Sequence, residues 1–523
     1  MKVLLVQPPP GTDFGFTNVL RIEPYGLESV GASLLQAGHE VEIVDMRLDD
    51  WVGLKSRFEA FGPGFVGVGC QFMSNTYAVI HTGNMLKALD PGVLMCVGGH
   101  HATLRPQDIL YPESPFDVLV YGEGEVTAAA LVDGYERRRE VERIPGVMTL
   151  SNMESGFVKR GRVPSLDQLP LPARHLTERY RGRYHQGSKV PSACVETSRG
   201  CPFDCNFCSI WVFYERTSRH RSAGGILSDL KDVAETNIFF TDDIAFLHRP
   251  TYEALGKMLR AEGVRKLYSA ETRCDLVVKY RDLFELWGSI GLDSVLLGVE
   301  KIDDEGLKAV RKRTDGDTNR LAIRMLQDMG IRPYTAFIVD PDWVEDDFDR
   351  LETYIDDLDI GQPTFTILTP LPGTELYGQM RDRLIDHNYL MYDTVHAVLP
   401  TRLPLERFYE RFAQLYARTA RWERVGFSAM RTAIRLTASG HGAVYKRLLK
   451  ALRQLRDPAA YLAPPFEQRP AGAQPLAPLT DCRRRVLPSL HRWGRGPTNG
   501  PHRSGGGLEN GRIDTRGGPP SPR

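Results

Sequence analysis

The chain has 523 residues, enough for roughly two to four domains. Its 66 Lys and Arg balance 66 Asp and Glu, so no excess positive charge is available to hold a nucleic-acid backbone. The composition, 42% hydrophobic and 25% charged, is typical of a water-soluble globular protein, and no apolar run approaches the ~18 residues that span a bilayer. We therefore expect a cytoplasmic protein that does not bind nucleic acid.

The first 150 residues alternate short apolar strands with helices, a pattern typical of a parallel sheet covered on both faces. Ligands of such α/β sheets bind beyond the carboxyl ends of the strands, and glycine-rich loops follow several strands here. These loops are also compatible with ordinary tight turns. The absence of G-x-G-x-x-G after the first strand makes an NAD site improbable. The predicted strands are residues 2–6, 40–44, 65–69, 93–97, 117–120 and 146–150, with helices at 25–37 and 75–89.

A second α/β series follows and predicts a partial (β/α)6 barrel, whose chemistry would sit at the carboxyl ends of the strands. Any one polar residue there could simply cap a helix, but the set predicts a site. The predicted strands are 193–197, 238–241, 267–270, 295–299, 334–339 and 365–368. The polar residues at their ends are Asp242, Asp243, Glu271, Arg273, Glu300, Asp340 and Asp342.

The remaining segments differ in composition. Residues 151–190 contain several prolines and are predicted to be an extended linker. Residues 388–463 are predicted to be helical, and 428–452 read as a basic amphipathic helix that either contacts an anionic membrane surface or caps the barrel. The Pro- and Gly-rich residues 464–523 are predicted to be disordered, as a dispensable extension or a nucleic-acid arm. The predicted domains are 1–150, the linker 151–190, the barrel 191–387, the helical region 388–463 and the tail 464–523.

Three of the eight cysteines are clustered as C-x3-C-x2-C: Cys201, Cys205 and Cys208. A structural zinc site normally needs four Cys or His ligands, and this loop offers three thiolates. Three thiolates can hold three irons of a 4Fe–4S cluster and leave the fourth open. The spacing, with Phe207 before the third cysteine, resembles the motif of radical S-adenosylmethionine (SAM) enzymes.

The resemblance extends over residues 1–420. The first 150 residues resemble the Rossmann-like cobalamin-binding domain that precedes a radical SAM barrel in cobalamin-dependent methylases. The stretches that carry this likeness are Pro8-Pro9, residues 25–28, 38–41, 98–103 and 122–125. Further stretches resemble the hopanoid C-3 methylase family: residues 20–24, 240–246, 271–273, 340–343 and 396–408.

The resemblance implies three cofactors: a 4Fe–4S cluster, SAM and cobalamin. It implies that a 5′-deoxyadenosyl radical removes a hydrogen atom from an unactivated carbon, which then receives a methyl group from methylcobalamin. The expected substrate carbon is C-3 of a hopanoid lipid. A C-methylase of an antibiotic or other secondary-metabolite precursor and a radical cyclase are the alternatives, whereas a cobalamin-binding regulator would need no cluster motif. No D-x-H-x-x-G motif is present, so we expect base-off cobalamin without that His as its lower ligand.

The resemblance also implies site residues and partners. The cluster ligands are Cys201, Cys205 and Cys208. The expected SAM contacts are Phe207, Asp242, Asp243, Glu271, Arg273 and Glu300. The expected cobalamin contacts are Pro8, Pro9, Gly98, Gly99, His100, Thr103, Gly122 and Glu123. The partners would be a small-molecule or lipid substrate and an electron donor such as flavodoxin or ferredoxin, with peripheral contact at the inner face of the membrane.

Overall fold

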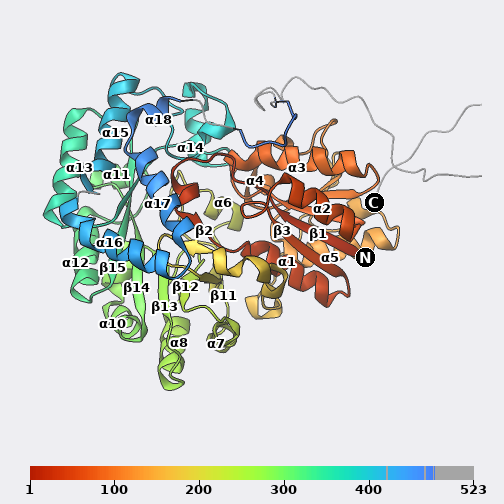
Figure 1. Cartoon of the computed structure of the whole chain (residues 1–523), viewed down its shortest axis with the longest axis horizontal. Coiled ribbons are helices and arrows are strands. Elements are labelled where there is room, and N and C mark those ends of the chain that lie inside the picture. Colours follow the sequence, from red (N-terminus) through yellow and green to blue (C-terminus); the bar gives the residue numbers. More distant parts are fainter. Residues whose placement is uncertain (420–421, 464–466, 475, 477–523) are drawn as a thin grey trace, which may run out of the picture. The chain divides into compact units, whose positions relative to one another are not determined.

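Two six-stranded sheets form the framework of the computed structural model, which describes residues 1–419, 422–463, 467–474 and 476 (Figure 1). The first has strand order β3-β1-β4-β5-β6-β7 and confirms the predicted Rossmann-like layout. One detail differs from the prediction: β7 runs antiparallel to β6, so the sheet is not wholly parallel. The strands are β1 (Lys2–Gln7), β3 (Glu40–Asp45), β4 (Phe65–Gly69), β5 (Leu94–Gly98), β6 (Val118–Val120) and β7 (Val147–Met148).

Helices cover both faces of this first sheet. Alternate residues of β1 show why: Val3 and Leu5 belong to one buried cluster, whereas Leu4 and Val6 belong to another. Because successive strand residues point to opposite faces, the strand must be apolar at every position. The helices are α1 (Tyr25–Gln36), α2 (Trp51–Phe61), α3 (Thr76–Leu89), α4 (His100–Leu104) and α5 (Gly124–Glu136).

The second sheet, of order β16-β15-β14-β13-β12-β9, is the predicted partial barrel, and all of its strand pairs are parallel. Its strands are β9 (Ser192–Val195), β12 (Asn237–Phe240), β13 (Leu267–Thr272), β14 (Leu292–Glu300), β15 (Arg332–Val339) and β16 (Pro363–Ile367). The helices around it are α6 (Ile210–Tyr214), α7 (Ala223–Asp232), α8 (Arg249–Ala261), α9 (Cys274–Lys279), α10 (Arg281–Ile290), α11 (Asp304–Ala309), α12 (Gly316–Asp328), α13 (Glu345–Asp357) and α14 (Glu375–Met380).

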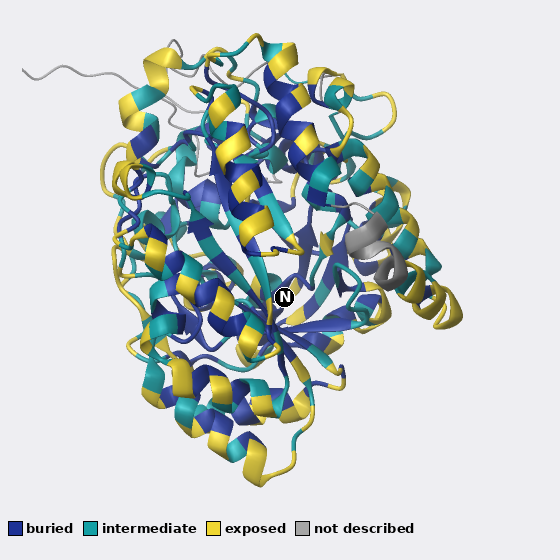
Figure 2. Ribbon diagram, turned by 90° about the vertical axis from the view of Figure 1, so that its left-hand side faces the viewer, coloured by how far each residue is buried: buried dark blue, intermediate teal, exposed yellow. Residues whose placement is uncertain are grey.

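The barrel core lies between the strands and these helices. Val295, Leu297 and Val299 of β14 all belong to it, together with the fully buried Trp287. Figure 2 shows the same division, with buried residues toward the sheets and exposed residues on the outer sides of the helices. Glu300 ends β14 with φ of +63°, beyond an irregularity in the strand register. Its carboxylate lies where a Cβ atom of Gly298 would point, on the face of β14 opposite to these core residues, the inner side of the barrel.

The predicted extended linker contains a ten-residue 3-10 helix, η6 (Arg174–Arg183). Buried ion pairs hold it: Arg174 lies 2.5 Å from Asp229, and Arg181 lies 2.6 Å from Glu23. The segment also forms β8 (His185–Gln186), which pairs with β2 (Leu20–Arg21). A short 3-10 helix, η5 (Leu166–Gln168), precedes η6, so the linker is extended only in part. The predicted domain limits remain a proposal.

The C-terminal region also differs from its prediction. Regular helix begins at α15 (Leu405–Thr419), and the expected single helix over 428–452 is divided between α16 (Trp422–Ala438) and α17 (Gly442–Leu455), followed by α18 (Pro458–Leu462). The apolar side of α17 packs against the 3-10 helix η1 (Gly15–Asn18), since Leu455 lies against Gly15. The apolar side of α17 is therefore used inside the protein.

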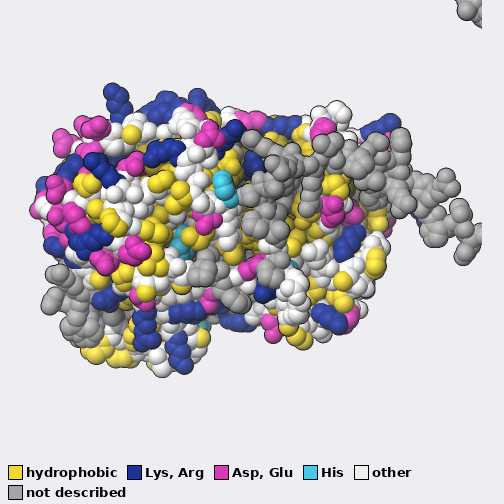
Figure 3. All heavy atoms as spheres, turned by 90° about the horizontal axis from the view of Figure 1, so that it is seen from above, with side chains coloured by type: hydrophobic (Ala, Val, Ile, Leu, Met, Phe, Trp, Pro, Cys, Tyr) yellow, Lys and Arg dark blue, Asp and Glu magenta, His cyan; other side chains and the backbone are white. Residues whose placement is uncertain are grey.

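Most of the predicted tail, residues 464–466, 475 and 477–523, lies outside the described residues. Within the described part, Glu467 lies 2.8 Å from the buried His81 of α3. None of the described helices is both long and apolar enough to cross a membrane. On the face seen in Figure 3, the basic and acidic side chains of the described residues are interspersed and form no large patch of one sign.

Candidate active site

The three clustered cysteines lie in one loop between β10 (Ser198–Arg199) and α6. Gly200 opens the loop with φ of +89°, and a Cβ atom there would lie 2.2 Å from the carbonyl oxygen of Thr217. Only glycine accepts this conformation without strain. The Gly200 N–H donates to the Asp243 carboxylate at 2.7 Å, so the end of β12 fixes the start of the loop.

Contacts from across the barrel fix the rest of the loop. Asn206 donates through its side-chain amide to the carbonyl of Ala309 at 3.0 Å and accepts from the backbone N–H of Leu376 at 3.0 Å. The Trp211 indole donates to the carbonyl of Cys205 at 2.8 Å. The loop is therefore held from three sides before any metal binds.

Burial of the three thiols opposes their ionisation. Burial raises the pKa of Cys208 to about 12 and also raises that of Cys201. Burial raises the pKa of Cys205 as well, against the lowering effect of nearby Lys312 and Arg273. Arg273 also opposes the shift at Cys201, and Lys312 opposes it at Cys208. Three thiols in one loop, each with a cation nearby, fit a 4Fe–4S cluster that leaves one iron open. Coordination to iron would favour the thiolate form that burial opposes.

Lys312 was not singled out by the sequence, where it lies within the basic run Arg311-Lys312-Arg313. Both flanking arginines have φ of +54°, and the chain turns so that Lys312 is buried and its ammonium lies 2.7 Å from Glu300. A Cβ atom on Gly298 would lie 2.6 Å from each of these two charged groups. Gly298 therefore gives the ion pair its space on the inner side of the barrel.

Arg273 is buried, and its donors are largely used within the protein. Its guanidinium donates to Asp275 at 2.8 Å and to the carbonyl of Lys312 at 2.7 Å. It also lies 3.8 Å from the ring centre of Phe203, which belongs to the cysteine loop. These contacts assign Arg273 a supporting role beneath the loop, whereas its predicted contact with SAM remains untested.

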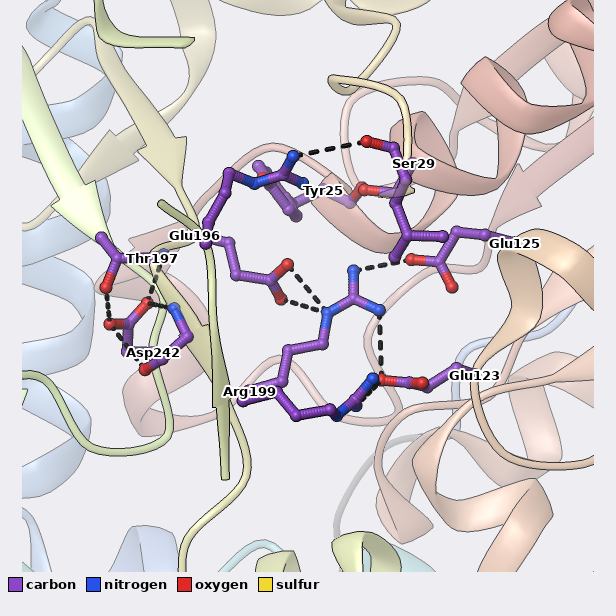
Figure 4. A network of polar contacts seen from close by, with 12 residues as sticks. Tyr25, Ser29, Glu123, Glu125, Glu196, Thr197, Arg199 and Asp242 are labelled. Atoms are coloured by element: carbon purple, nitrogen blue, oxygen red, sulfur yellow. Dashed lines mark hydrogen bonds and ion pairs between the residues drawn. The ribbon is translucent and has the colours of Figure 1, made fainter. Parts of the chain in front are cut away.

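The two adjacent aspartates at the end of β12 differ. Asp242 is buried and accepts hydrogen bonds from the N–H groups of Thr197 and Ser198 at 2.7 and 3.0 Å, and from the Tyr252 hydroxyl at 2.6 Å. Its carboxylate is thus occupied in holding the turn after β9 (Figure 4). Among the described residues, Asp243 accepts a hydrogen bond only from the N–H of Gly200, through one of its two carboxylate oxygens.

Asp243 and Glu271 together form the acidic part of the site. Burial raises the pKa of Asp243 to about 6 and that of Glu271 to about 7, and the Asp243 charge adds to the latter shift. Paired carboxyls that share a desolvated space favour a cation between them. Among the other predicted residues, Asp340 pairs with the buried Lys301 at 2.7 Å, and Phe207 lies half-buried beside Cys208.

A second set of predicted site residues lies in the glycine loops at the carboxyl edge of the first sheet. These loops have the backbone geometry expected of a ligand site. Gly99 has φ of +116°, and a Cβ atom there would lie 2.7 Å from the carbonyl oxygen of Cys70. Gly122 has φ of +80° and donates its N–H to the Thr103 hydroxyl at 2.9 Å. Gly98, Pro8 and Pro9 lie on the same carboxyl edge, at the ends of β5 and β1.

The two edges meet at His100. A hydrogen bond of 2.9 Å joins its Nε2 to the hydroxyl of Ser209, the residue after Cys208. Its ring stacks on Phe213 of α6 with centres 4.7 Å apart. Burial lowers the pKa of His100 to about 4, so the ring is neutral. This predicted cobalamin contact therefore touches the cysteine loop directly.

Arg199, immediately before the cysteine loop, makes the second connection (Figure 4). It lies 2.6 Å from Glu125, 2.8 Å from Glu196 and 3.3 Å from Glu123. Glu123, predicted to contact cobalamin, is thus engaged by Arg199 and also by Arg219. Arg199, Glu125 and Glu196 were missed as functional residues, because nothing local in the sequence indicates their pairing.

The segments that contain these two sheet edges match two known domain families. Residues 15–132 match the B12 binding domain, and residues 195–355 match the radical SAM superfamily. The solved structure of the cobalamin-dependent SAM radical enzyme OxsB, with aqua-cobalamin and SAM bound, superposes with a TM-score of 0.64 and 16% identity, over 87% of this chain and 71% of that one. The fold and site thus define a cobalamin-dependent radical SAM enzyme.

Comparison with named relatives shows to which family within this class the chain belongs. The hopanoid C-3 methylase of Methylococcus capsulatus is 36% identical over 78% of this chain and 78% of its own length. An anaerobic magnesium-protoporphyrin IX monomethyl ester cyclase of Synechocystis sp. is 25% identical over 78% of this chain and 83% of its own length. The chain belongs to the family of the hopanoid C-3 methylase and is a cobalamin-dependent radical SAM methyltransferase. Its cofactors are a 4Fe–4S cluster, SAM and cobalamin.

Proposed function

We propose that this enzyme methylates an unactivated ring carbon of a hopanoid lipid, namely C-3 of the A ring. The observation that carries the proposal is the 36% identity to the hopanoid C-3 methylase of Methylococcus capsulatus, which extends over 78% of the chain. Such a carbon is not a nucleophile, so a polar methyl transfer would fail there.

When bound, the cluster and SAM supply a radical that removes a hydrogen atom, and methylcobalamin supplies the methyl group. The protein's part is to hold and orient these groups. Cys201, Cys205 and Cys208 would ligate three irons, and Asp243 with Glu271 would accept the ammonium of SAM. Phe207, which precedes Cys208, Arg273, which follows β13, and Glu300, which ends β14, would provide further contacts with SAM.

The cobalamin would lie over the carboxyl edge of the first sheet, against Gly98, Gly99 and Gly122. Close approach of backbone to a ligand is what glycine permits. The bond between His100 and Ser209 supports this arrangement, because it connects the loop after β5 to the cysteine loop at 2.9 Å. A methyl donor and a radical source at adjoining edges are what transfer to a carbon radical requires.

A lipid substrate and an external reductant complete the proposal. Helix α16 exposes Met430 by 46% and Ile434 by 63%, and basic residues lie on the same helix. This surface would contact an anionic membrane. Flotation with vesicles containing anionic lipid tests it: Met430→Glu with Ile434→Glu should reduce binding, and equal flotation of this variant and the original would reject the membrane contact. A flavodoxin or ferredoxin would supply the electron.

Expression in a hopanoid-producing host that lacks C-3 methylation tests the substrate. We expect a hopanoid heavier by one methyl group, about 14 Da, labelled from methyl-labelled methionine. The Cys201→Ala variant should give none. Methylation of a soluble antibiotic precursor instead would reject a hopanoid as the substrate. A cyclised product that carries no added methyl group would favour the cyclase alternative.

A further inference from the structure

A small pocket on the edge of the first sheet is walled by the linker. Its lining includes Gly122 and Glu123, which follow β6, and Phe213 of α6. Lys159, Arg160 and Arg162 of the linker complete it, and Arg162 donates to the carbonyl of Phe213 at 2.5 Å. These three cations belong neither to the cysteine loop nor to the acidic part of the site.

The basic segment is fixed at both ends. At one end, the carbonyl of Val158 accepts from the N–H of Gly146 at 2.7 Å. At the other end, the carbonyl of Val163 accepts from Arg219 at 2.9 Å. The backbone that carries the three cations is therefore held in place at both ends. This restraint reduces the entropy that is lost when a ligand binds.

The cations are incompletely neutralised. Lys159 and Arg162 share one carboxylate, that of Glu215. Arg160 donates to the Thr127 hydroxyl at 2.9 Å and to the carbonyl of Pro145 at 3.1 Å, and no acid of the described residues lies within ion-pairing distance of it. Burial lowers the pKa of Arg160, as expected for a cation without an acidic partner.

The two acids that line the pocket, Glu123 and Glu125, do not cancel this charge. Glu123 pairs with Arg199 and Arg219, and Glu125 pairs with Arg199. The pocket therefore keeps a positive excess that favours an anion.

The pocket adjoins the proposed cobalamin edge through two of its lining residues. The N–H of Gly122 bonds to Thr103, and the ring of Phe213 stacks on His100. A ligand on that edge with an anionic extension could thus reach the linker. Cobalamin has one such extension, because its nucleotide tail carries a phosphodiester, and the tail is not tied to cobalt in the base-off form.

We propose that Lys159, Arg160 and Arg162 bind the phosphodiester of the nucleotide tail of cobalamin, so that the linker forms part of the cofactor site. The inference rests on the proposed placement of cobalamin at the edge of the first sheet. The planar guanidinium of arginine suits two oxygens of a phosphate.

Titration of the full chain with hydroxocobalamin and with cobinamide, which lacks the nucleotide tail, tests the proposal. Bound corrinoid is measured by absorbance. We expect Arg160→Gln to weaken hydroxocobalamin about tenfold or more and to leave the cobinamide affinity unchanged. Arg160→Lys should lose less. The matched control is Arg143→Gln, which removes a cation that is 83% exposed.

Either of two results for Arg160→Gln would overturn the proposal. One is no loss of hydroxocobalamin affinity, and the other is an equal loss for both corrinoids, which would mark Arg160 as merely structural. Lys159→Gln repeats the test at a side chain that is 42% exposed. This variant leaves the bonds of Arg160 to Thr127 and Pro145 in place. Inorganic phosphate should compete with hydroxocobalamin and not with cobinamide. Tight binding of phosphate without this competition would indicate a site for free anions and would reject binding of the nucleotide tail. Failure of the original chain to bind either corrinoid would instead reject the cobalamin placement itself.

Discussion

Arg199 and Glu125 join the cysteine loop of the barrel to the first sheet through a buried ion pair of 2.6 Å, in which both side chains are less than a tenth exposed. Burial works to raise the pKa of Glu125, but Arg199 outweighs it and holds this pKa below its usual value. By contrast, burial raises the pKa of Glu196 to about 7 although Arg199 opposes the shift. One guanidinium thus compensates several buried acids at the junction.

Removing this guanidinium should destabilise the protein strongly. Arg199→Ala leaves the buried Glu125 and Glu196 without their cationic partner, whereas Glu123 keeps Arg219. We therefore expect the free energy of unfolding to fall by about 3–5 kcal/mol. Denaturant titration measures the change. The control is Arg143→Ala, at an exposed position, which should change stability by less than about 0.5 kcal/mol. A loss below about 1 kcal/mol for Arg199→Ala would contradict the role of the pair.

The buried Lys312 should tune the reduction potential of the cluster. A cation favours the more negative, reduced cluster, so Lys312→Met should make the potential more negative, on the order of tens of mV. Glu300→Gln should shift it the other way, since it removes the partner anion 2.7 Å from the ammonium. Redox titration followed by electron paramagnetic resonance measures both. Lys308→Met, at an exposed position on α11, is the control, and equal potentials in all variants would refute the prediction.

Glu28 should make stability fall with rising pH. Its side chain is buried beside Glu23, accepts from the Thr177 hydroxyl at 2.5 Å, and has its pKa raised by burial from 4.5 to about 8. The folded protein therefore retains a proton that the unfolded chain releases between pH 4.5 and 8, so stability decreases through this range and the loss is complete above about pH 8.

Glu28→Gln mimics the neutral carboxyl and should remove this loss. We expect the variant to be more stable than the original by about 1–3 kcal/mol at pH 8 and similar to it near pH 5. Thermal unfolding at a series of pH values measures the difference. Glu59→Gln, at a side chain 56% exposed, should leave the pH profile unchanged. An unaltered profile in Glu28→Gln would show that another group is responsible.

The C-terminal helices should restrain the loop after β1. Tyr461 of α18 is buried, and its ring centre lies 5.2 Å from that of Phe14 and 5.1 Å from that of Tyr409. Lys450 of α17 pairs with Asp13 beside them. Tyr461→Ala removes a large buried side chain, which costs about 3–5 kcal/mol locally.

Hydrogen exchange measures the consequence: amides of residues 13–19 should exchange faster in Tyr461→Ala, while those of β1 and β4 remain protected. Tyr461→Phe keeps the ring and should resemble the original chain. Unchanged exchange in residues 13–19 would mean that these helices do not hold the loop.

Several parts of the protein are determined by the sequence alone. The period of apolar residues gives both strand series, because a strand buried on both faces must be apolar along its whole length. The spacing of Cys201, Cys205 and Cys208 predicts the cluster ligands, because the three thiols lie in one short loop and need no distant residue. Gly99 and Gly122 follow the same logic, since their backbone conformations are a local property.

Only the tertiary structure decides how these parts act together. Arg199 meets Glu125 across 74 positions of chain, and the ion pair of Lys312 with Glu300 depends on two positive φ angles within a run of charges that reads as solvated. The linker shows the same limit: its prolines predict extension, yet buried ion pairs support η6. Ion pairs between distant residues form because packing excludes water from both partners, and a local sequence pattern carries no information about that packing.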